Sequence, residues 1–326
     1  MQRRDFEIYH RRYSYLGGQW VQGGGWWHYY LYAAGVKVPL GLWALLLLAL
    51  FWTWRDRSRL DAAARRELLL LWLPAMTIFV FVSSQRSLQS HFRYVLPMIP
   101  FLIVFLGRAG AVFSGGAGRG TRAAVAAMLV WAAASYLWVH PYSLGYFNEL
   151  AGGPHGGHNH LLGSNIDWGQ DLFRLRRWLD EHPEAASELK MAYFNRIDAR
   201  IAGLEWDVPP HGVTETAPDD ESAAGYGPQP GYYAISVRFV RGNQAGATDG
   251  RGGYRFAPFR AYEYFRHFEP IAKAGYSIFI YRITPEQANA VRTLYGLPPL
   301  PAEDQSITAN DRDRQDALMP EHQGGL

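Results

Sequence analysis

The chain has 326 residues, of which 32 are basic and 29 acidic, and a formal net charge of +3. It contains no cysteine, which excludes disulfides and thiolate metal sites. The mean hydropathy of −0.17 alone suggests a soluble protein of about two domains. That average conceals two unlike parts, because residues 34–140 are dominated by apolar side chains and residues 141–326 are polar and rich in Gly and Pro. The arginines cluster beside the apolar segments, so we expect no nucleic-acid partner.

Residues 1–33 form the first predicted unit, an aromatic-rich segment next to the membrane. The run QWVQGGGWWHYYLY contains Trp26, Trp27, Tyr29 and Tyr30 just before the first apolar segment. Aromatics in this position are typical of the lipid headgroup layer. The alternative is a surface on which sugar rings stack, as part of an outer loop.

Residues 34–140 are predicted to be a membrane domain with four transmembrane helices. The four apolar segments are Val38–Trp54, Leu68–Ser84, Tyr94–Gly107 and Ala123–Val139. Three have 17 residues, the lower end of what crosses a hydrocarbon core of about 30 Å. The third is shorter and is bracketed by Arg93 and Arg108, which can reach opposite interfaces. The alternative, buried helices of a soluble core, fits poorly with four such segments and charged separators.

The distribution of arginine predicts the orientation of this bundle. Arginines crowd the loops after the first and third segments, at Arg55, Arg57, Arg59, Arg65, Arg66, Arg108, Arg119 and Arg122. The loop between the second and third segments has only Arg86 and Arg93. The positive-inside rule therefore places the first two loops in the cytoplasm and both termini outside. We expect a multi-pass protein of the cell (inner) membrane whose residues after His140 are extracytoplasmic.

Two groups of polar residues at the outer side of the bundle are candidates for binding a lipid phosphate. His91, Arg93 and Tyr94 stand where the outer loop meets the third segment. An arginine fork holds phosphate well, although plain anchoring at the interface explains the same residues. Lys37 lies at the outer end of the first segment, where its ammonium either extends to the interface or meets the same phosphate.

Residues 141–300 are predicted to form a small extracytoplasmic α/β domain, followed by a disordered tail over residues 301–326. Asp167 with Gln170 has the spacing of a capping box, and Leu172, Leu175 and Leu179 follow it as one apolar helix face. The expected later elements are strands over 191–195, 232–240 and 276–283, loops over 209–231 and 241–253, and helices over 261–268 and 285–294.

Possible metal ligands are present, but we expect no metal cofactor. His155, His158 and His160 lie in a Gly-rich loop, without the rigid spacing and fourth ligand typical of a zinc site. Asn165, Asp167 and Asp171 offer oxygen atoms but do not form an EF-hand loop. A divalent metal at either cluster is therefore the less favoured interpretation.

Four stretches carry a resemblance to a known family: GWWHYYLYAAGVKVPL, HFRYVLPMIPF, HPYSLGYFNELAGGP and SNIDWGQDLFRLRRWLDEH. Together they resemble the C-terminal half of bacterial membrane glycosyltransferases related to the protein O-mannosyltransferases (GT-C superfamily, glycosyltransferase family 39-type), over roughly residues 15–285. The resemblance implies transfer of a sugar from a polyprenyl-phosphate carrier to an acceptor outside the cytoplasm. It also implies that His91, Arg93 and Tyr94, with Lys37 close by, lie near the donor phosphate.

The catalytic residue is the point at which the chain departs from this family. The family's catalytic acid lies in the first outer loop of a longer chain, and none of the carboxylates here, Asp5 and Glu7 included, stands in a matching motif. We therefore expect that the chain is a fragment, has a mis-assigned start or is one subunit of a split enzyme. In each case the catalytic N-terminal half would be a missing part of the protein or a partner subunit. The alternative function is a non-catalytic membrane-anchored protein that binds a glycan or a partner.

Overall fold

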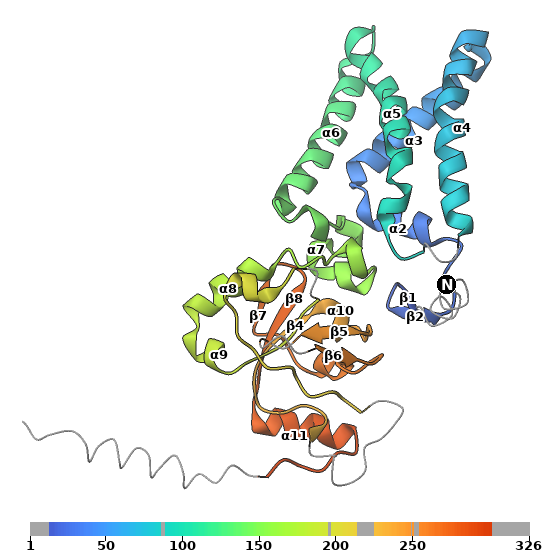
Figure 1. Ribbon diagram of the computed structural model, residues 1–326. Coiled ribbons are helices and arrows are strands. Elements are labelled where there is room, and N and C mark those ends of the chain that lie inside the picture. The colour runs from blue at the N-terminus through green and yellow to red at the C-terminus, as the bar shows by residue number, and fades with distance from the viewer. Residues whose placement is uncertain are drawn as a thin grey trace, which may run out of the picture.

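The computed structural model describes residues 13–85, 89–194, 197–213, 225–248, 250 and 254–301. A group of long helices stands on a part that contains a small β-sheet (Figure 1). Arg86 and the predicted tail after residue 301 lie outside the described residues.

Three long helices within the described residues are long and apolar enough to cross a membrane. They are α4 (Ala62–Ser84), the continuous unit of η3 (Phe92–Met98) and α5 (Ile99–Ser114), and α6 (Arg119–Val139), with mean hydropathies of 1.8, 2.0 and 1.5 over their most apolar windows. Only 11%, 22% and 17% of these windows is buried inside the protein. Such exposure of apolar surface fits helices that face lipid and argues against a soluble core.

The first predicted segment, Val38–Trp54, forms one helix of 16 residues that is joined to the helix before it at a sharp bend. It becomes α3 (Leu40–Arg55), which meets α2 (Tyr29–Lys37) at an angle of 113°. The pair counts as a fourth span only if this bent unit crosses as one. The break falls at Val38, whose backbone is extended, because the following Pro39 disfavours the helical conformation of the residue before it.

Glycine and small residues let the membrane helices pack closely. A Cβ built on Gly41 of α3 would lie 2.7 Å from the backbone nitrogen of Ala132 in α6 and would also meet the carbonyl oxygen of Met128. Leu45, Ala109 and Val125 form a small buried cluster between α3, α5 and α6. Close approach at small residues is the usual way in which membrane helices gain contact.

The polar part contains one four-stranded sheet in the order β3 (Leu189–Ala192), β4 (Gly231–Ser236), β8 (Ile278–Ile283) and β7 (Ala272–Ala274). The β3 and β4 strands pair in parallel, and the other pairs are antiparallel. Alternate residues of β8 enter different cores: Ile278 and Ile280 pack on the α8 side, whereas Phe279 and Tyr281 pack on the other face.

Helices cover both faces of this sheet, in agreement with the predicted α/β arrangement. One face is covered by α8 (Leu172–Glu181) and α9 (Pro183–Ser187) (Figure 1). Residues of η10 (Glu263–His267) and α11 (Pro285–Leu294) belong to the core on the other face. The second core continues into the base of the membrane helices, where it includes Tyr29, Tyr30 and Val95. One apolar core therefore joins the sheet to the membrane part.

The remaining described elements are short. They are two hairpins, β1 (Tyr13–Leu16) with β2 (Gln19–Gln22) and β5 (Ala245–Thr248) with β6 (Tyr254–Ala257), and the short helices η1 (Arg57–Arg59), η4 (Ser143–Gly145), η5 (Glu149–Ala151), α7 (Gly153–Gly156), η6 (Gly157–Asn159), η7 (Gly163–Asn165), η8 (Ala199–Ala202) and α10 (Val237–Val240).

Several predicted boundaries were wrong, each for a local reason. Asp167 does not cap α8: its Oδ1 accepts a hydrogen bond from the Gly169 N–H at 2.9 Å, and Gly169 adopts φ +85°, so the helix begins only at Leu172. The strand predicted over 232–240 ends at Ser236, where the chain turns into α10. The helix predicted over 261–268 is a shorter 3-10 helix, η10. The helix α11 has the predicted bounds, 285–294. The strand before it, β8, ends at the predicted residue Ile283 but begins at Ile278, two residues later than predicted.

Candidate functional site

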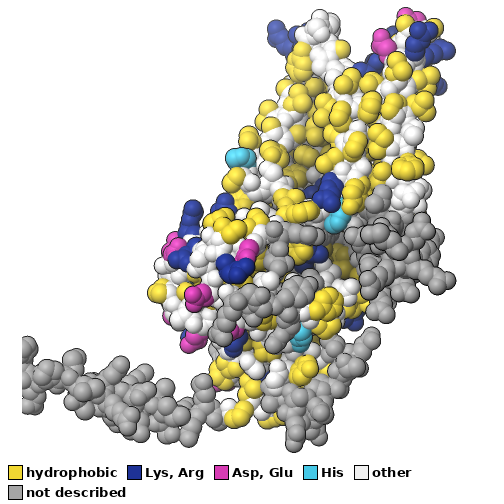
Figure 2. Space-filling model, viewed as in Figure 1, with side chains coloured by type: hydrophobic (Ala, Val, Ile, Leu, Met, Phe, Trp, Pro, Cys, Tyr) yellow, Lys and Arg dark blue, Asp and Glu magenta, His cyan; other side chains and the backbone are white. Residues whose placement is uncertain are grey.

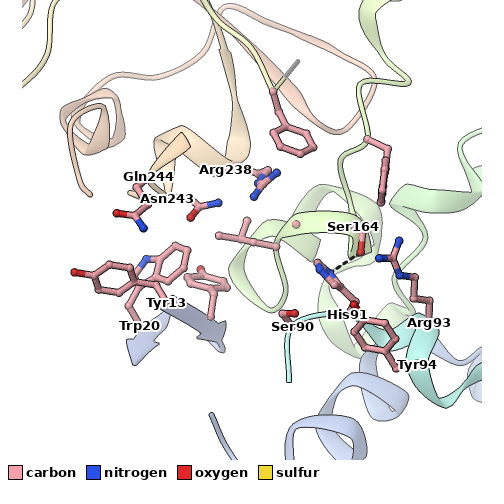
Figure 3. A pocket seen from close by; sticks show the side chains of 15 residues that line it. Tyr13, Trp20, Ser90, His91, Arg93, Tyr94, Ser164, Arg238, Asn243 and Gln244 are labelled. Atoms are coloured by element: carbon pink, nitrogen blue, oxygen red, sulfur yellow. Dashed lines mark hydrogen bonds between the residues drawn. The ribbon is translucent and has the colours of Figure 1, made fainter. Parts of the chain in front are cut away.

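A cavity of about 350 Å³ lies where the membrane helices meet the sheet-containing part. Its lining comes from five separate stretches of the chain: the β1–β2 hairpin, the loop that enters η3, residues 162–168, Phe194, and the stretch from α10 to Gln244. His91, Arg93, Tyr94 and Ser164 lie at one end and Tyr13, Trp20, Asn243 and Gln244 at the other, with Arg238 between them (Figure 3).

The three predicted phosphate-binding residues of the outer loop all line this cavity. The Arg93 guanidinium carbon lies 5.3 Å from the ring centroids of both Tyr94 and Trp168, so two aromatic faces flank it. The side chain is exposed, and within the described residues no carboxylate forms an ion pair with it. Arg93 therefore presents a positive charge at the membrane end of the cavity.

His91 is oriented by a neighbouring loop. Its Nδ1 lies 2.5 Å from the Oγ of Ser164, which belongs to η7. Because the ring has a hydrogen-bond partner at Nδ1, its orientation in the cavity is defined. Gly163 allows this approach: it has φ +66°, and a Cβ there would lie 3.3 Å from the His91 ring.

Asn165 holds the loop that enters η3 in place, a role that the sequence did not reveal. The buried Asn165 side chain accepts from the Phe92 N–H at 2.8 Å and donates to the carbonyl oxygens of Ser90 at 3.0 Å and Leu162 at 2.8 Å. It also donates to the Tyr29 hydroxyl at 3.1 Å. These bonds connect both sides of His91 to η7 and to α2.

Lys37 does not reach the cavity. Its ammonium donates to the carbonyl oxygens of Leu144, Tyr146 and Asn165 at 2.9, 2.7 and 2.8 Å. An ammonium has three N–H donors, so all of them are used inside the protein. Lys37 joins the end of α2 to the polar part, and neither predicted interpretation, extension to the interface or contact with a phosphate, fits this geometry.

The aromatic residues predicted for the outer loop separate into two environments. Tyr29 and Tyr30 are buried in the shared core, whereas Trp27 is 76% exposed. None of the four lines the cavity. The aromatic wall comes instead from the preceding hairpin: Tyr13 stacks on Phe259 with ring centroids 4.0 Å apart, and Trp20 meets Tyr13 edge-on at 6.3 Å.

Arg238, Asn243 and Gln244 are cavity residues that the sequence analysis missed. Arg238 stacks on Phe194 at 3.7 Å. The predicted strand over 232–240 gave no reason to single out Arg238. Asn243 and Gln244 lie in a Gly-rich stretch that was predicted to be a loop. Behind Arg238 lies the fully buried Asp167; burial raises the pKa of this carboxyl to about 6, while the Gly169 N–H and the Arg238 charge act in the opposite direction.

The candidate metal ligands are directed to separate partners. His158 Nδ1 accepts from Arg241 Nε at 3.1 Å, His160 Nδ1 lies 2.5 Å from the Tyr32 hydroxyl, and the His155 ring packs edge-on against Tyr276. The Oδ2 atom of Asp171 accepts from the Ser277 N–H at 3.1 Å and from its hydroxyl at 2.8 Å. In the described ranges, no three such side chains come together as metal ligands.

No protein-family model, curated protein or solved structure matches the chain. The chemistry of the cavity is therefore inferred from its own residues. Two guanidinium groups and an imidazole suit an anion, and amides beside aromatic faces suit a sugar ring. Among the described residues that line the cavity, none is acidic, so the lining supplies binding groups but no carboxylate base.

Proposed function

We propose that the chain is part of an integral membrane glycosyltransferase that binds a polyprenyl-phosphate-linked sugar and moves the sugar to an extracytoplasmic acceptor. The observation that supports this most is the position of Arg93 and His91. Both line one cavity at the base of helices that are long and apolar enough to cross a membrane. A phosphate attached to a lipid chain lies at that level, beside the hydrocarbon region.

The phosphate is assigned to the membrane end of the cavity. Arg93 has no carboxylate partner among the described residues, and a guanidinium binds two phosphate oxygens at once. His91, held by Ser164, supplies one more polar contact. We place the lipid tail toward the exposed apolar surface of η3 and α5, which includes Leu96 and Ile103.

The sugar is assigned to the opposite end. Asn243 and Gln244 can each donate to and accept from hydroxyl groups, and Trp20 and Tyr13 offer rigid aromatic surfaces. Arg238 lies between the two ends (Figure 3). Its charge is partly balanced by Asp167, so we assign it to hydrogen bonds with the sugar and with the near phosphate oxygen.

In the transfer itself, an acceptor hydroxyl oxygen forms a bond to C1 of the sugar while the bond from C1 to the phosphate oxygen breaks. The phosphate leaves with the electron pair, and the hydroxyl proton passes to a base. None of the described lining residues is a carboxylate, so this base is assigned to no residue here. The same observation favours the second candidate, a membrane-anchored protein that binds a lipid-linked glycan without transferring its sugar.

The binding step is tested first, with the full chain in nanodiscs and a polyprenyl phosphate as the probe. Loss of one charge-assisted contact should weaken binding by roughly ten- to a hundredfold in Arg93→Ala, with partial rescue in Arg93→Lys. Arg200→Ala is the matched control, because Arg200 is exposed, is paired with Asp198 and does not line the cavity. Polyprenol, which lacks the phosphate, should bind equally to parent and Arg93→Ala.

Equal polyprenyl-phosphate binding by inserted Arg93→Ala and parent would contradict the phosphate assignment and leave Arg93 as an interfacial anchor. A second measurement, release of polyprenyl phosphate from a polyprenyl-phosphate-linked sugar with an acceptor present, separates the two candidate functions. Binding with release supports the transferase, and binding without release supports the glycan-binding protein.

A further inference from the structure

A second cavity lies at the opposite, arginine-rich end of the helices. It has a volume of about 550 Å³, is open to the outside, and is lined mainly by residues of α3, α5 and α6. Its polar lining is Arg55, Asp56, Arg108 and Thr121, and the rest includes Ala49, Trp52, Ala111 and Val112. Figure 2 shows Lys and Arg side chains gathered at these far tips of the helices, beyond a long apolar surface.

The charges around this cavity are not equivalent. The Arg55 guanidinium forms two hydrogen bonds to the Asp56 carboxylate, at 3.1 and 3.2 Å, so this pair is neutral overall. Arg122 donates to the carbonyl oxygens of two lining residues, Val112 and Gly115, at 3.1 and 2.6 Å, where it closes the connection between α5 and α6. Arg108 remains as a positive charge in the lining without a carboxylate partner among the described residues.

The apolar side chains around Arg108 favour an anionic lipid over a soluble anion as the ligand. Apolar side chains of the same cavity, Trp52, Val112 and Ala49, lie beside its charged groups. The outer surfaces of α3 and α5 are apolar and exposed at Leu50, Val104 and Phe113. A ligand that fits both features has an anionic head and acyl chains, and basic cavities between membrane helices bind such headgroups.

We infer that this cavity binds the headgroup of an anionic phospholipid, with the phosphate at Arg108 and the acyl chains along the apolar surface of α3 and α5. This site is separate from the proposed sugar-phosphate cavity, from which it differs in every lining residue. The lining side chains Arg55, Asp56 and Arg108 together carry a charge of +1, and Arg122 adds a further positive charge beside them, which favours a phosphodiester headgroup of charge −1. The lipid would then hold α3, α5 and α6 together at this end.

The test is native mass spectrometry of the full chain, released from micelles that contain either phosphatidylglycerol or phosphatidylcholine. We expect the parent to retain phosphatidylglycerol preferentially, and Arg108→Ala to bind it about tenfold more weakly. Arg108→Gln should behave like Arg108→Ala and keeps a long polar side chain at the position. Arg119→Ala is the control, since Arg119 stands at the same end but does not line the cavity.

Equal retention of phosphatidylglycerol by Arg108→Ala, Arg108→Gln and Arg119→Ala would overturn the proposal. Equal retention of phosphatidylcholine by the parent would do so as well. Glycerol 3-phosphate provides the third arm: if it binds as tightly as phosphatidylglycerol, the site recognises a soluble phosphate and not a lipid. Arg93→Ala should retain phosphatidylglycerol like the parent, so failure of the sugar-phosphate proposal remains distinguishable from failure of this one.

Discussion

At the scale of single residues, the candidate site depends on buried polar side chains that bind no ligand themselves. Asn165 joins the loop that enters η3 to η7 and α2 with four hydrogen bonds. Lys37 holds another loop in the same way, by donating hydrogen bonds to the carbonyl oxygens of Leu144 and Tyr146. Asp171 accepts hydrogen bonds from the backbone N–H groups of Tyr276 and Ser277. Such groups are costly to leave unpaired, so their loss should disturb loops that are distant in sequence.

We expect Asn165→Ala to destabilise the protein by about 2–4 kcal/mol, because several buried groups lose their partners together. It should also weaken polyprenyl-phosphate binding by releasing the loop that carries His91 and Arg93. Thermal unfolding in nanodiscs and the same lipid-binding measurement check both effects. The control is Asn289→Ala, which removes one bond, from the Leu300 N–H, and should leave lipid binding unchanged. An Asn165→Ala variant with parental stability would contradict the role of this side chain.

The pH dependence of stability should report Asp167. Burial raises the pKa of this carboxyl to about 6, against a reference value of 3.8 in the unfolded chain. Between these values the folded state holds the proton more tightly, so the contribution of Asp167 to stability is greatest below pH 3.8 and falls as pH rises toward 6. The total change is roughly 3 kcal/mol, and Arg238 and Asp171 are the charged groups that act on it.

We therefore predict that Asp167→Asn is less sensitive to pH than the parent between pH 4 and 6, a range that follows from the same pKa shift. Thermal unfolding of the full chain across this range is the measurement. Asp180→Asn, at an exposed carboxylate in an ion pair with Arg176, is the control and should retain the parental profile. Identical profiles for parent and Asp167→Asn would show that this carboxyl is not the buried acid described here.

At the scale of elements, the contact between α3 and α6 depends on Gly41. A Cβ at this position would meet the α6 backbone, which cannot move aside like a flexible side chain. We expect Gly41→Ala to destabilise the helix pair by about 1–3 kcal/mol through overpacking. Gly110→Ala is the matched control, because a Cβ at Gly110 of α5 meets nothing within 4 Å. Thermal unfolding of both variants checks this; equal midpoints would contradict the close contact.

At the scale of the whole molecule, the arginine asymmetry predicts which side each part faces. We expect the loop with η1 to be cytoplasmic and the sheet-containing part to be outside. The chain has no native cysteine, so single cysteines at Ser58 and Ser187, both exposed, give unambiguous positions. An impermeant thiol reagent on intact cells should label Ser187→Cys only. Labelling of Ser58→Cys without Ser187→Cys would reverse the orientation and remove the extracytoplasmic acceptor from the proposal.

Sequence predicted best the features that arise from neighbouring residues. Uninterrupted apolar runs become helices around Leu68–Ser84 and Ala123–Val139, and Pro285 begins α11 at the predicted residue. Less was predictable where two local signals compete. Asp167 has capping-box spacing, yet the left-handed Gly169 ends the pattern, and α8 begins only at Leu172.

The sequence by itself determined that the chain has an apolar helical part, with helices long enough to cross a membrane, and a polar part, because hydropathy depends on composition along the chain. It also placed His91, Arg93 and Tyr94 together, since they are neighbours. Only the tertiary structure decided that Arg238, Asn243 and Trp20 join them and that Lys37 does not. The physical reason is that cavity walls and buried hydrogen bonds form between residues tens to hundreds of positions apart, as from Lys37 to Asn165, and no local pattern records those distances.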